Sequence, residues 1–482
     1  MKTPDLYPIK RVVIIGGGFT GTMVAVRLLN DSSAPLEIVL IEKRKQVGRG
    51  LAYSTDCQAH LLNVRAQAMS AYPDQPLHFL QFARRVDPAY SQDSFAPRAL
   101  YGAYIQAILR ESLHRASAKP VSYQVSCDEA IDLDHDIATG KAVVQLASGQ
   151  SLAADYVVLA TGNLPSRPPE HFPKDLLSSG RYIHDPWSRH AAATIGSDTN
   201  VLIIGTGLTA VDTVVELLKN GYRGQMVALS RHGLLPRAHS NASMKSCPVP
   251  EMGLPASALD TLRFVRHLAS RNQDWRPALD SLRPVTQDWW RQLPDHERTR
   301  FLRHLQALWD VHRHRMAPEI ATLIEGAISS GRLTVQAGRV LDLSVHGSAI
   351  SVRIGKRGSI DTACFTVNRV VNCTGFSGSV SRLDSALIHN LLARGIATIH
   401  PLGTGVNTDC FGHLIDQHGQ PQRRLLTAGP TLKPQLFESV AVPELRVQAR
   451  HLAELLLSEL GQTSGYSQPS PLTSRVPALL VP

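Results

Sequence analysis

The sequence predicts an α/β fold built from two similar strand–turn–helix units, because one phrase occurs in it twice. Residues 11–21 read RVVIIGGGFTG and residues 200–210 read NVLIIGTGLTA. At both places an apolar run typical of a buried strand precedes a glycine-rich turn and a helix. A second phrase is also repeated, as YVVLATG at 156–162 and RVVNCTG at 369–375. The two kinds of phrase alternate along the chain, so one unit is predicted to be split by the other.

The glycine-rich turns have the spacing of Rossmann-like dinucleotide sites. The small residues are Gly16, Gly18 and Gly21 in a GxGxxG turn, and Gly205, Gly207 and Ala210 in a GxGxxA turn. The first glycine makes the tight turn, the second lets backbone N–H groups approach a pyrophosphate, and the third position must be small for helix packing. One such turn is often an ordinary loop, but two copies with matching strands favour two sites. The N-terminus of each helix then binds the anion.

The residue that ends the second strand of each unit predicts which dinucleotide binds there. A strand at 37–42 ends on Glu42, about 20 residues after the turn, where a carboxylate accepts hydrogen bonds from a ribose 2′-hydroxyl. An acid repels a 2′-phosphate, so the first site is predicted to bind FAD; a solvated acid is the alternative. The strand at 226–230 precedes Arg231, with Arg237 nearby. A guanidinium binds a 2′-phosphate, which favours NADPH over NADH, unless Arg231 is only solvated.

Composition indicates an ordinary folded enzyme. The 482 residues are 43% hydrophobic and 19% charged, and they are enough for two or three domains. The net charge is +10, but no Lys/Arg tract is long enough to follow a nucleic-acid backbone. We therefore expect anionic cofactors and a small-molecule substrate, with no nucleic-acid partner, while the oligomeric state stays open.

The cysteine pattern and the N-terminal segment indicate in which cellular compartment the protein is expected. None of the six cysteines lies in a CxxC motif, which argues against a disulfide framework, a zinc ribbon and a redox dithiol. His312 and His314 are two residues apart and would face different sides of a helix, so no metal site is predicted. No signal-type segment precedes the first strand and no apolar run approaches membrane-spanning length, so we expect a cytoplasmic protein without a membrane partner.

The order of these segments predicts the domain plan. We expect the first part of the FAD-binding domain at 1–190, the NADPH-binding domain at 191–368, a helical insertion at about 240–325, the second part of the FAD-binding domain at 369–462, and a loose tail at 463–482. Between the repeated phrases, alternation at 121–152 predicts a small β-meander. In the insertion, one helical stripe starts at Leu259 and another runs from Phe301 to His312 after an expected cap at Asp295. Four of the five tryptophans lie there, which suggests a substrate cap.

Three further stretches resemble a known group of proteins, the two-dinucleotide-binding-domain flavoproteins. They read GRGLAYST from Gly48, HLLNVRAQAMS from His60, and GPTLKPQLFESVAVPELRVQA at 429–449. The chain looks like an FAD/NAD(P)-binding family related to class B flavin monooxygenases. Gly180 and His184 also match part of the FxGxxxHxxxW signature of Baeyer–Villiger monooxygenases, although Ser178 replaces Phe and Trp187 comes one residue early. The resemblance implies two Rossmann-like domains, an FAD domain split by an NADPH domain.

From the turns and from this resemblance we expect the following site residues. Asn63 and His184 are the catalytic candidates; an Asx-turn is the alternative for Asn63. Arg98 is expected to contact a phosphate or a surface acid. A turn at Gly429 precedes a helix whose start is marked by Ser439 and Pro443. The cofactor-binding residues are expected to be Gly16, Gly17, Gly18, Phe19, Thr20, Gly21, Glu42, Lys43, Gly50, Leu62, Asn63, Val64, Arg98, Val125, Thr161, Gly162, Gly205, Gly207, Leu208, Thr209, Arg231, Arg237, Thr374, Gly375, Gly429, Glu438 and Pro443.

These features predict an FAD-dependent, NADPH-using oxidoreductase, with a monooxygenase acting through a C4a-hydroperoxyflavin as the leading hypothesis. Flavin carries the difficult chemistry, which is consistent with the lack of a recognisable acid–base triad. N-, S- and carbonyl-directed oxygenation stay open. One alternative is an NADPH-dependent reductase of a quinone, a metal or a carrier protein. The other is a non-catalytic FAD-binding redox sensor.

Overall fold

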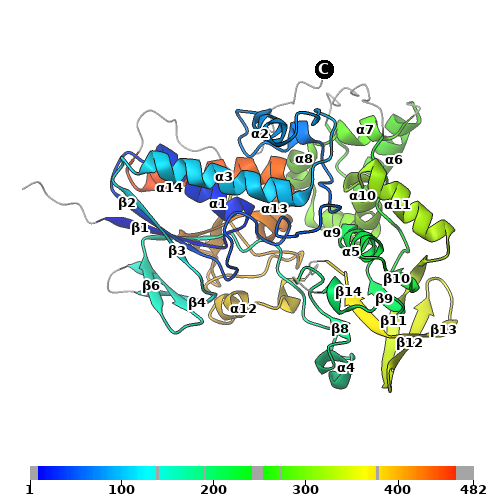
Figure 1. Ribbon diagram of the computed structural model, residues 1–482. Coiled ribbons are helices and arrows are strands. Elements are labelled where there is room, and N and C mark those ends of the chain that lie inside the picture. Colours follow the sequence, from blue (N-terminus) through cyan, green and yellow to red (C-terminus); the bar gives the residue numbers. More distant parts are fainter. Residues whose placement is uncertain are drawn as a thin grey trace, which may run out of the picture.

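Two sheets, each formed around one copy of the repeated phrase, lie on opposite sides of the molecule, the first on the left and the second on the right in Figure 1. The computed structural model describes residues 9–136, 140–188, 191–240, 253–271, 274–375 and 379–462. The predicted tail at 463–482 lies outside these residues. None of the helices in the described ranges combines the length and apolar character that a membrane span requires.

The first sheet has six strands in the order β15-β16-β7-β1-β2-β3. The strands are β1 (Lys10–Ile15), β2 (Leu36–Ile41), β3 (Val121–Ser126), β7 (Tyr156–Leu159), β15 (His413–Ile415) and β16 (Pro421–Thr427). All neighbours pair in parallel except β15 and β16. Val12, Val13 and Ile14 in β1 are fully buried, because both faces of this parallel sheet are covered.

Helices cover one face of the first sheet and a smaller sheet covers the other (Figure 1). The helical side is formed by α1 (Phe19–Asp31), α2 (His78–Val86), α3 (Arg98–Ala116) and α14 (Val442–Glu459). The opposite side carries β4 (Ala130–Asp136), β5 (Lys141–Leu146), β6 (Ser151–Ala154) and α12 (Ala386–Ala393). The chain between β16 and α14 forms a short 3-10 turn, η4 (Gly429–Leu432), and α13 (Lys433–Leu436).

The second sheet has seven strands in the order β13-β12-β11-β10-β9-β14-β8. The strands are β8 (Tyr182–Ile183), β9 (Val201–Ile204), β10 (Met226–Ser230), β11 (Leu333–His346), β12 (Ala349–Lys356), β13 (Thr362–Val367) and β14 (Arg369–Asn372). Its helices are α4 (Lys174–Ser178), α5 (Leu208–Lys219) and α11 (Pro318–Ser329). Further 3-10 turns are η1 (Ala66–Ala68), η2 (Ala192–Thr194) and η3 (Val380–Arg382).

The insertion between β10 and α11 is helical, as predicted. It contains α6 (Ala258–Ser270), α7 (Arg276–Asp280), α8 (Thr286–Gln292), α9 (Asp295–His304) and α10 (Gln306–Arg313). The predicted residues 241–252 lie outside the described ranges.

Several expectations about these elements need correction. β3 pairs with β2 in the first sheet, so the small antiparallel sheet contains only the strands from Ala130 onward. β14 lies between β9 and β8, so the second unit continues beyond residue 368. β8, before residue 191, belongs to it as well. The sheet to which a strand belongs is decided by the strand with which it pairs. The alternation of apolar and polar residues within one strand does not identify that partner.

The insertion also differs from the predicted stripes and boundaries. Leu259 is 54% exposed, and the second stripe is divided between α9 and α10 at Leu305. Asp295 is the first residue of α9 and Pro294 takes the cap position. α11 packs against α5 and precedes β11, so it is the crossover helix of the second unit and the insertion ends before it.

A buried histidine in the first unit predicts a pH dependence of stability. The ring of His413 is 1% exposed and lies 2.8 Å from Asp409 Oδ2 and 3.3 Å from Glu459 Oε1. Burial alone lowers the pKa of His413, but hydrogen bonds and charge from the two carboxylates outweigh it and raise the pKa to about 9. Because the folded pKa exceeds the unfolded value of about 6.5, the contribution is full below that pH and is lost as pH rises through about 9.

We therefore expect the free energy of unfolding to fall by up to about 3 kcal/mol more between pH 6.5 and 9.5 in the wild type than in His413→Gln. Denaturant unfolding at both pH values measures this difference. Equal falls in the two proteins would contradict the assignment.

Candidate dinucleotide sites

The first glycine-rich turn has the backbone that a pyrophosphate site requires. Gly16 has φ of 108°, and a Cβ there would lie 2.3 Å from the carbonyl oxygen of Ala160. A Cβ at Gly21 would lie 2.0 Å from the carbonyl oxygen of Gly16. No side chain caps α1 and its first turn contains no acid. The N–H groups at this helix end are therefore available to an anion, and the residues fit FAD.

The predicted partners of this turn lie beside it. Gly50 approaches Gly18 so closely that a Cβ at Gly50 would lie 2.9 Å from Gly18 Cα. Glu42 is 8% exposed, and its carboxylate accepts hydrogen bonds from the N–H groups of Gly17 at 2.8 Å and Arg44 at 2.9 Å. A carboxylate has further lone pairs for a ribose hydroxyl. Contact of Glu42 with the ribose stays a prediction.

Other predicted residues of the first site have more varied environments. Lys43 lies at the surface, where its ammonium pairs with Glu129 at 2.9 Å. Val125 is 41% exposed on β3, and Thr161 Oγ1 is buried without a hydrogen-bond partner. Gly162 has φ of 65°. Phe19 and Thr20 are buried in the first turn of α1. Leu62 belongs to the hydrophobic core between the first sheet and its helices, and Val64 packs against this core.

The second turn repeats the first. Gly205 has φ of 116°, and a Cβ there would lie 2.1 Å from the carbonyl oxygen of Cys373. Gly207 precedes α5, which also lacks a side-chain cap and an acid in its first turn. A Cβ at Gly207 would have no neighbour within 4 Å, because this glycine faces open space. The residues therefore fit a second dinucleotide.

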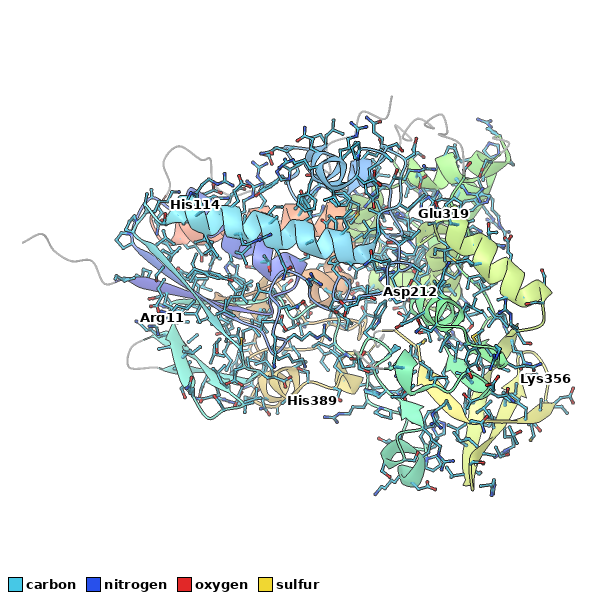
Figure 2. All side chains as sticks on the ribbon, in the orientation of Figure 1. Arg11, His114, Asp212, Glu319, Lys356 and His389 are labelled. Carbon is cyan, nitrogen blue, oxygen red and sulfur yellow. The ribbon has the colours of Figure 1, made fainter. Side chains whose placement is uncertain are left out.

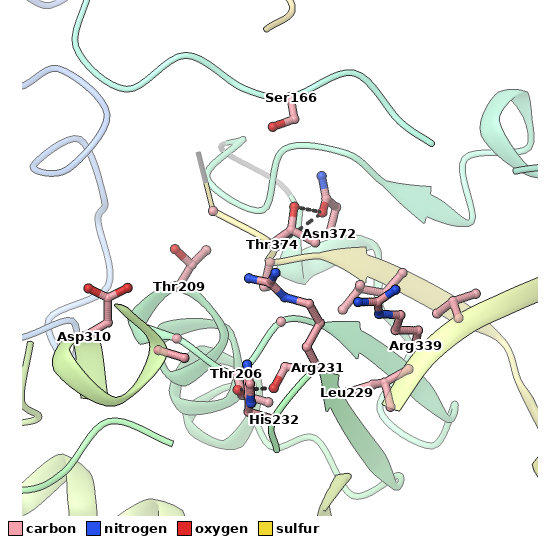
Figure 3. Close-up of a pocket in the computed structure, with 18 of the residues that line it drawn as sticks. Ser166, Thr206, Thr209, Leu229, Arg231, His232, Asp310, Arg339, Asn372 and Thr374 are labelled. Atoms are coloured by element: carbon pink, nitrogen blue, oxygen red, sulfur yellow. Dashed lines mark hydrogen bonds between the residues drawn. The ribbon is translucent and has the colours of Figure 1, made fainter. Parts of the chain in front are cut away.

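That open space is a cavity of about 840 Å³ (Figure 3). The predicted residues Gly205, Gly207, Leu208, Thr209, Arg231, Thr374 and Gly375 all line it. Thr374 Oγ1 donates to Asn372 Oδ1 at 2.8 Å. The cavity is bordered by the carboxyl ends of the parallel strands β9, β10 and β14, where ligands bind in open α/β sheets.

The arginine pair at this site differs from the predicted one. Arg231 lines the cavity, but Arg237 is exposed outside it and its backbone pairs with Val311 and Met316. Arg167, Arg339 and Arg382 also line the cavity, and Arg339 lies on β11, the strand next to β10 (Figure 3). β11 pairs with β10, which brings Arg231 and Arg339 to the same edge of the sheet. No motif marks Arg339 in the sequence.

Arg98, for which a phosphate contact stays a prediction, has close protein partners. Its Nη2 lies 2.7 Å from Asp212 Oδ2, and Nε donates to the carbonyl of Leu61 at 3.1 Å. The side chains of Arg98 and Asp212 are 12% and 9% exposed. Arg98 therefore connects the two units and contacts neither a surface acid nor the turn.

Glu438 has a structural partner as well. It is 8% exposed, and both carboxylate oxygens accept from Arg313 of the insertion, at 2.8 and 3.1 Å. Burial raises its pKa, but the charges of Arg313 and Arg283 outweigh this and lower it. Glu438 therefore docks the insertion on the first unit, and its contact with a cofactor stays a prediction.

Aromatic side chains complete this docking. Trp290 stacks on Phe437 with ring centroids 4.6 Å apart, and its Nε1 donates to the carbonyl of Pro434 at 2.8 Å. Phe437 has φ of 56°, a conformation that costs about 1–3 kcal/mol and is held by such packing. Trp289, Trp290 and Trp309 are core residues, and the insertion is fixed to the first unit. Among the described residues of the insertion, those that line the cavity belong to α10 or its end, such as Asp310 and His314.

For the remaining candidate residues, the expected cofactor-binding or catalytic roles stay predictions. Gly429 has φ of 81° and its N–H donates to Gln448 at 2.8 Å. Pro443 lies in the first turn of α14, whose cap is Ala441 and not Ser439. The carbonyl of Asn63 accepts from His239 Nε2 at 3.0 Å. Both ring nitrogens of His184 are buried without partners, outside the lining of the cavity. No described His, Cys, Asp and Glu side chains gather in threes to hold a metal ion.

Comparison with known proteins agrees with this geometry. Residues 13–164 match a family described as FAD-NAD(P)-binding. None of the curated proteins matches the chain in sequence. Among solved structures, the ornithine N-hydroxylase of Kutzneria sp. 744, with reduced FAD, NADP+ and L-ornithine, superposes with a TM-score of 0.64 at 16% identity. The match covers 94% of this chain and all of the hydroxylase.

Two other solved structures have the same architecture. The FAD-bound cadaverine monooxygenase of Erwinia amylovora has a TM-score of 0.64 at 14% identity, over 97% of this chain and 100% of that one. The bacillithiol disulfide reductase of Bacillus cereus has a TM-score of 0.53 at 15% identity, over 93% and 99% of the two chains. These likenesses confirm the predicted fold: the chain has two Rossmann-like α/β units, and its residues 13–164 match the FAD-NAD(P)-binding family.

Proposed function

We propose that the chain is an FAD-dependent, NADPH-using oxidoreductase, and that it is a monooxygenase acting on a small molecule. One observation carries the proposal. The cavity at the second glycine-rich turn is lined by Arg231 and Arg339 of the second unit and also by Lys433, which follows the Gly429 turn of the first unit. A dinucleotide bound there by its phosphates can therefore extend toward the first unit.

The residues have separate roles in this proposal. The N–H groups after Gly18 and Gly207 bind the two pyrophosphates, and Arg231 with Arg339 binds the 2′-phosphate of NADPH. FAD, when bound, supplies the acceptance of hydride and the chemistry with oxygen. The chain supplies position and a pocket with limited access to water. Val311 and Leu234 add apolar lining to that pocket.

The relatives support the oxygenase over the reductase. Two of them act on amines, ornithine and cadaverine, and share the full length of this fold. The disulfide reductase has a lower TM-score. We therefore propose small amines as the first substrates to assay.

The experiment reduces the FAD-bound protein with NADPH without oxygen and then admits oxygen together with ornithine, lysine or cadaverine. A monooxygenase gives an oxygenated amine in proportion to the NADPH consumed. A reductase instead reduces a quinone or an artificial acceptor without oxygen and yields no oxygenated product. A flavin that NADPH does not reduce would identify a non-catalytic sensor and contradict the proposal.

A further inference from the structure

We propose that Arg98, Asp212 and His60 form a junction that sets the angle between the two dinucleotide units and so positions NADPH against FAD. The inference rests on the proposed function, because position matters only if hydride passes between the two sites. These are positioning residues. Asp212 belongs to α5, the helix that follows the second glycine-rich turn, and Arg98 and His60 hold this helix from the first unit, a role that needs no contact with a cofactor.

The ion pair acts directly on α5. Asp212 lies on this helix shortly after Gly207, on the side of the second unit that faces the first (Figure 2). Its Oδ2 is 2.7 Å from Nη2 of Arg98, the first residue of α3 in the first unit. Arg98 is held in turn by the carbonyl of Leu61 at 3.1 Å and lies over the ring of Trp187, 5.3 Å from its centroid.

His60 adds a second contact to the same helix. Its Nε2 lies 3.0 Å from the backbone carbonyl of Asp212 and 3.7 Å from Glu216 Oε2. A carbonyl oxygen only accepts, so Nε2 carries the hydrogen. Nδ1 lies 2.7 Å from Thr55 Oγ1, which fixes the ring from the other side. The His60 ring is 2% exposed, so these bonds form away from water.

The next residue of α5, Thr213, contacts the sheet of the second unit from another side of the helix. Thr213 Oγ1 lies 3.4 Å from Sγ of Cys373, and the carbonyl of Cys373 is the group that Gly205 approaches. Asp212 thus connects α5 to the first unit, and Thr213 connects α5 to the sheet of the second unit. The turn at Gly205 and Gly207 is held between these two attachments.

Apolar contacts at the same place cannot set an angle by themselves. Ala59, Leu61 and Phe95 of the first unit pack against the core cluster that contains α5 residues. Such contacts are favourable but not directional. The hydrogen bond from His60 Nε2 to the carbonyl of Asp212 is directional, and the Arg98–Asp212 ion pair adds a short charge contact, although a buried pair is often no more stabilising than apolar residues of similar size. Burial raises the pKa of Asp212, and Arg98 and His60 oppose the shift. We conclude that the pair contributes orientation more than stability.

The test replaces the pair with apolar residues, Arg98→Met with Asp212→Leu, which avoids leaving one buried charge without its partner. The matched control is Arg223→Gln with Asp198→Asn, which removes an Arg–Asp pair of the same unit whose side chains are 73% and 67% exposed. Each protein is measured for FAD content, for the Kd of NADPH, and for the limiting rate of flavin reduction without oxygen.

We expect the apolar variant to keep its FAD and a Kd for NADPH within about twofold of the wild type, because the turns and Arg231 are unchanged. The limiting rate should fall at least about tenfold, since a misplacement of about 1 Å can cost 100-fold. Arg98→Lys, which keeps the charge, should recover part of the rate. An unchanged limiting rate in the apolar variant would overturn the proposal, as would a loss confined to the Kd.

A second measurement does not depend on catalysis. Spin labels on Cys127 of the first unit and Cys364 of the second, both exposed, report the distance between the units after Cys57, Cys247 and Cys410 are changed to Ser. The distance distribution should broaden or shift in the apolar variant and stay unchanged in the control. An unchanged distribution would overturn the junction. If NADPH fails to reduce the flavin of the wild type, the proposed function is wrong, and this distance still tests the junction.

Discussion

Gly18→Val is expected to give a folded but colourless protein. A Cβ at Gly18 meets only Gly50 Cα, at 3.6 Å, so the chain itself tolerates the side chain. The added bulk instead occupies the space through which the N–H groups reach the pyrophosphate. Charge-assisted hydrogen bonds contribute about 1.5–3 kcal/mol each, so losing two should weaken FAD binding at least about 100-fold. Flavin absorbance per protein after purification measures the effect.

The matching variant in the second unit is the control. Gly207→Val also leaves the chain without a clash, because nothing lies within 4 Å of its Cβ. It should stay yellow and lose reduction by NADPH. Full FAD occupancy in Gly18→Val, or loss of FAD from Gly207→Val, would contradict the assignment of the two turns.

Arg231→Ala combined with Arg339→Ala is expected to raise the KM for NADPH about 100- to 10,000-fold and to change the KM for NADH less than about threefold. Both guanidiniums border the cavity beside the carboxyl end of β10, where a 2′-phosphate would lie: Arg231 follows this strand, and Arg339 lies in the middle of the neighbouring β11. Each lost charge-assisted bond corresponds to about 10- to 100-fold in affinity, and NADH has no phosphate to lose.

Arg237→Ala is the matched control for this pair, because its side chain is exposed outside the cavity. It should leave the ratio of kcat/KM for NADPH and NADH unchanged. The same ratio in the double variant and the wild type would show that these arginines do not bind the 2′-phosphate.

The repeated phrases were sufficient to predict the fold and the geometry of both glycine-rich turns. Glycine at positions 16 and 205 is required by positive φ, which is a local property that the spacing of the motif records. The carbonyls that approach these glycines, those of Ala160 and Cys373, belong to the second repeated phrase. Arg231 could be predicted because it directly follows the second strand of its unit.

The residues that sequence reasoning missed depend on contacts between distant segments. Arg339 reaches the cavity only because β11 pairs with β10 across the whole insertion. Arg98 and Asp212 belong to different units, and Glu438 pairs with Arg313 of the insertion. Arg98 and Glu438, which were expected to contact cofactors, have charged protein partners, and a single sequence carries no signal for such pairs.

The most direct test of the central claim, that the second turn binds NADPH where it can reduce FAD at the first, is an anaerobic titration of the yellow protein. The proposed structure predicts that both NADPH and NADH bleach the flavin, with a Kd for NADPH at least about 100-fold lower because of Arg231 and Arg339. A flavin that neither nucleotide bleaches, or equal Kd values for the two, would contradict it.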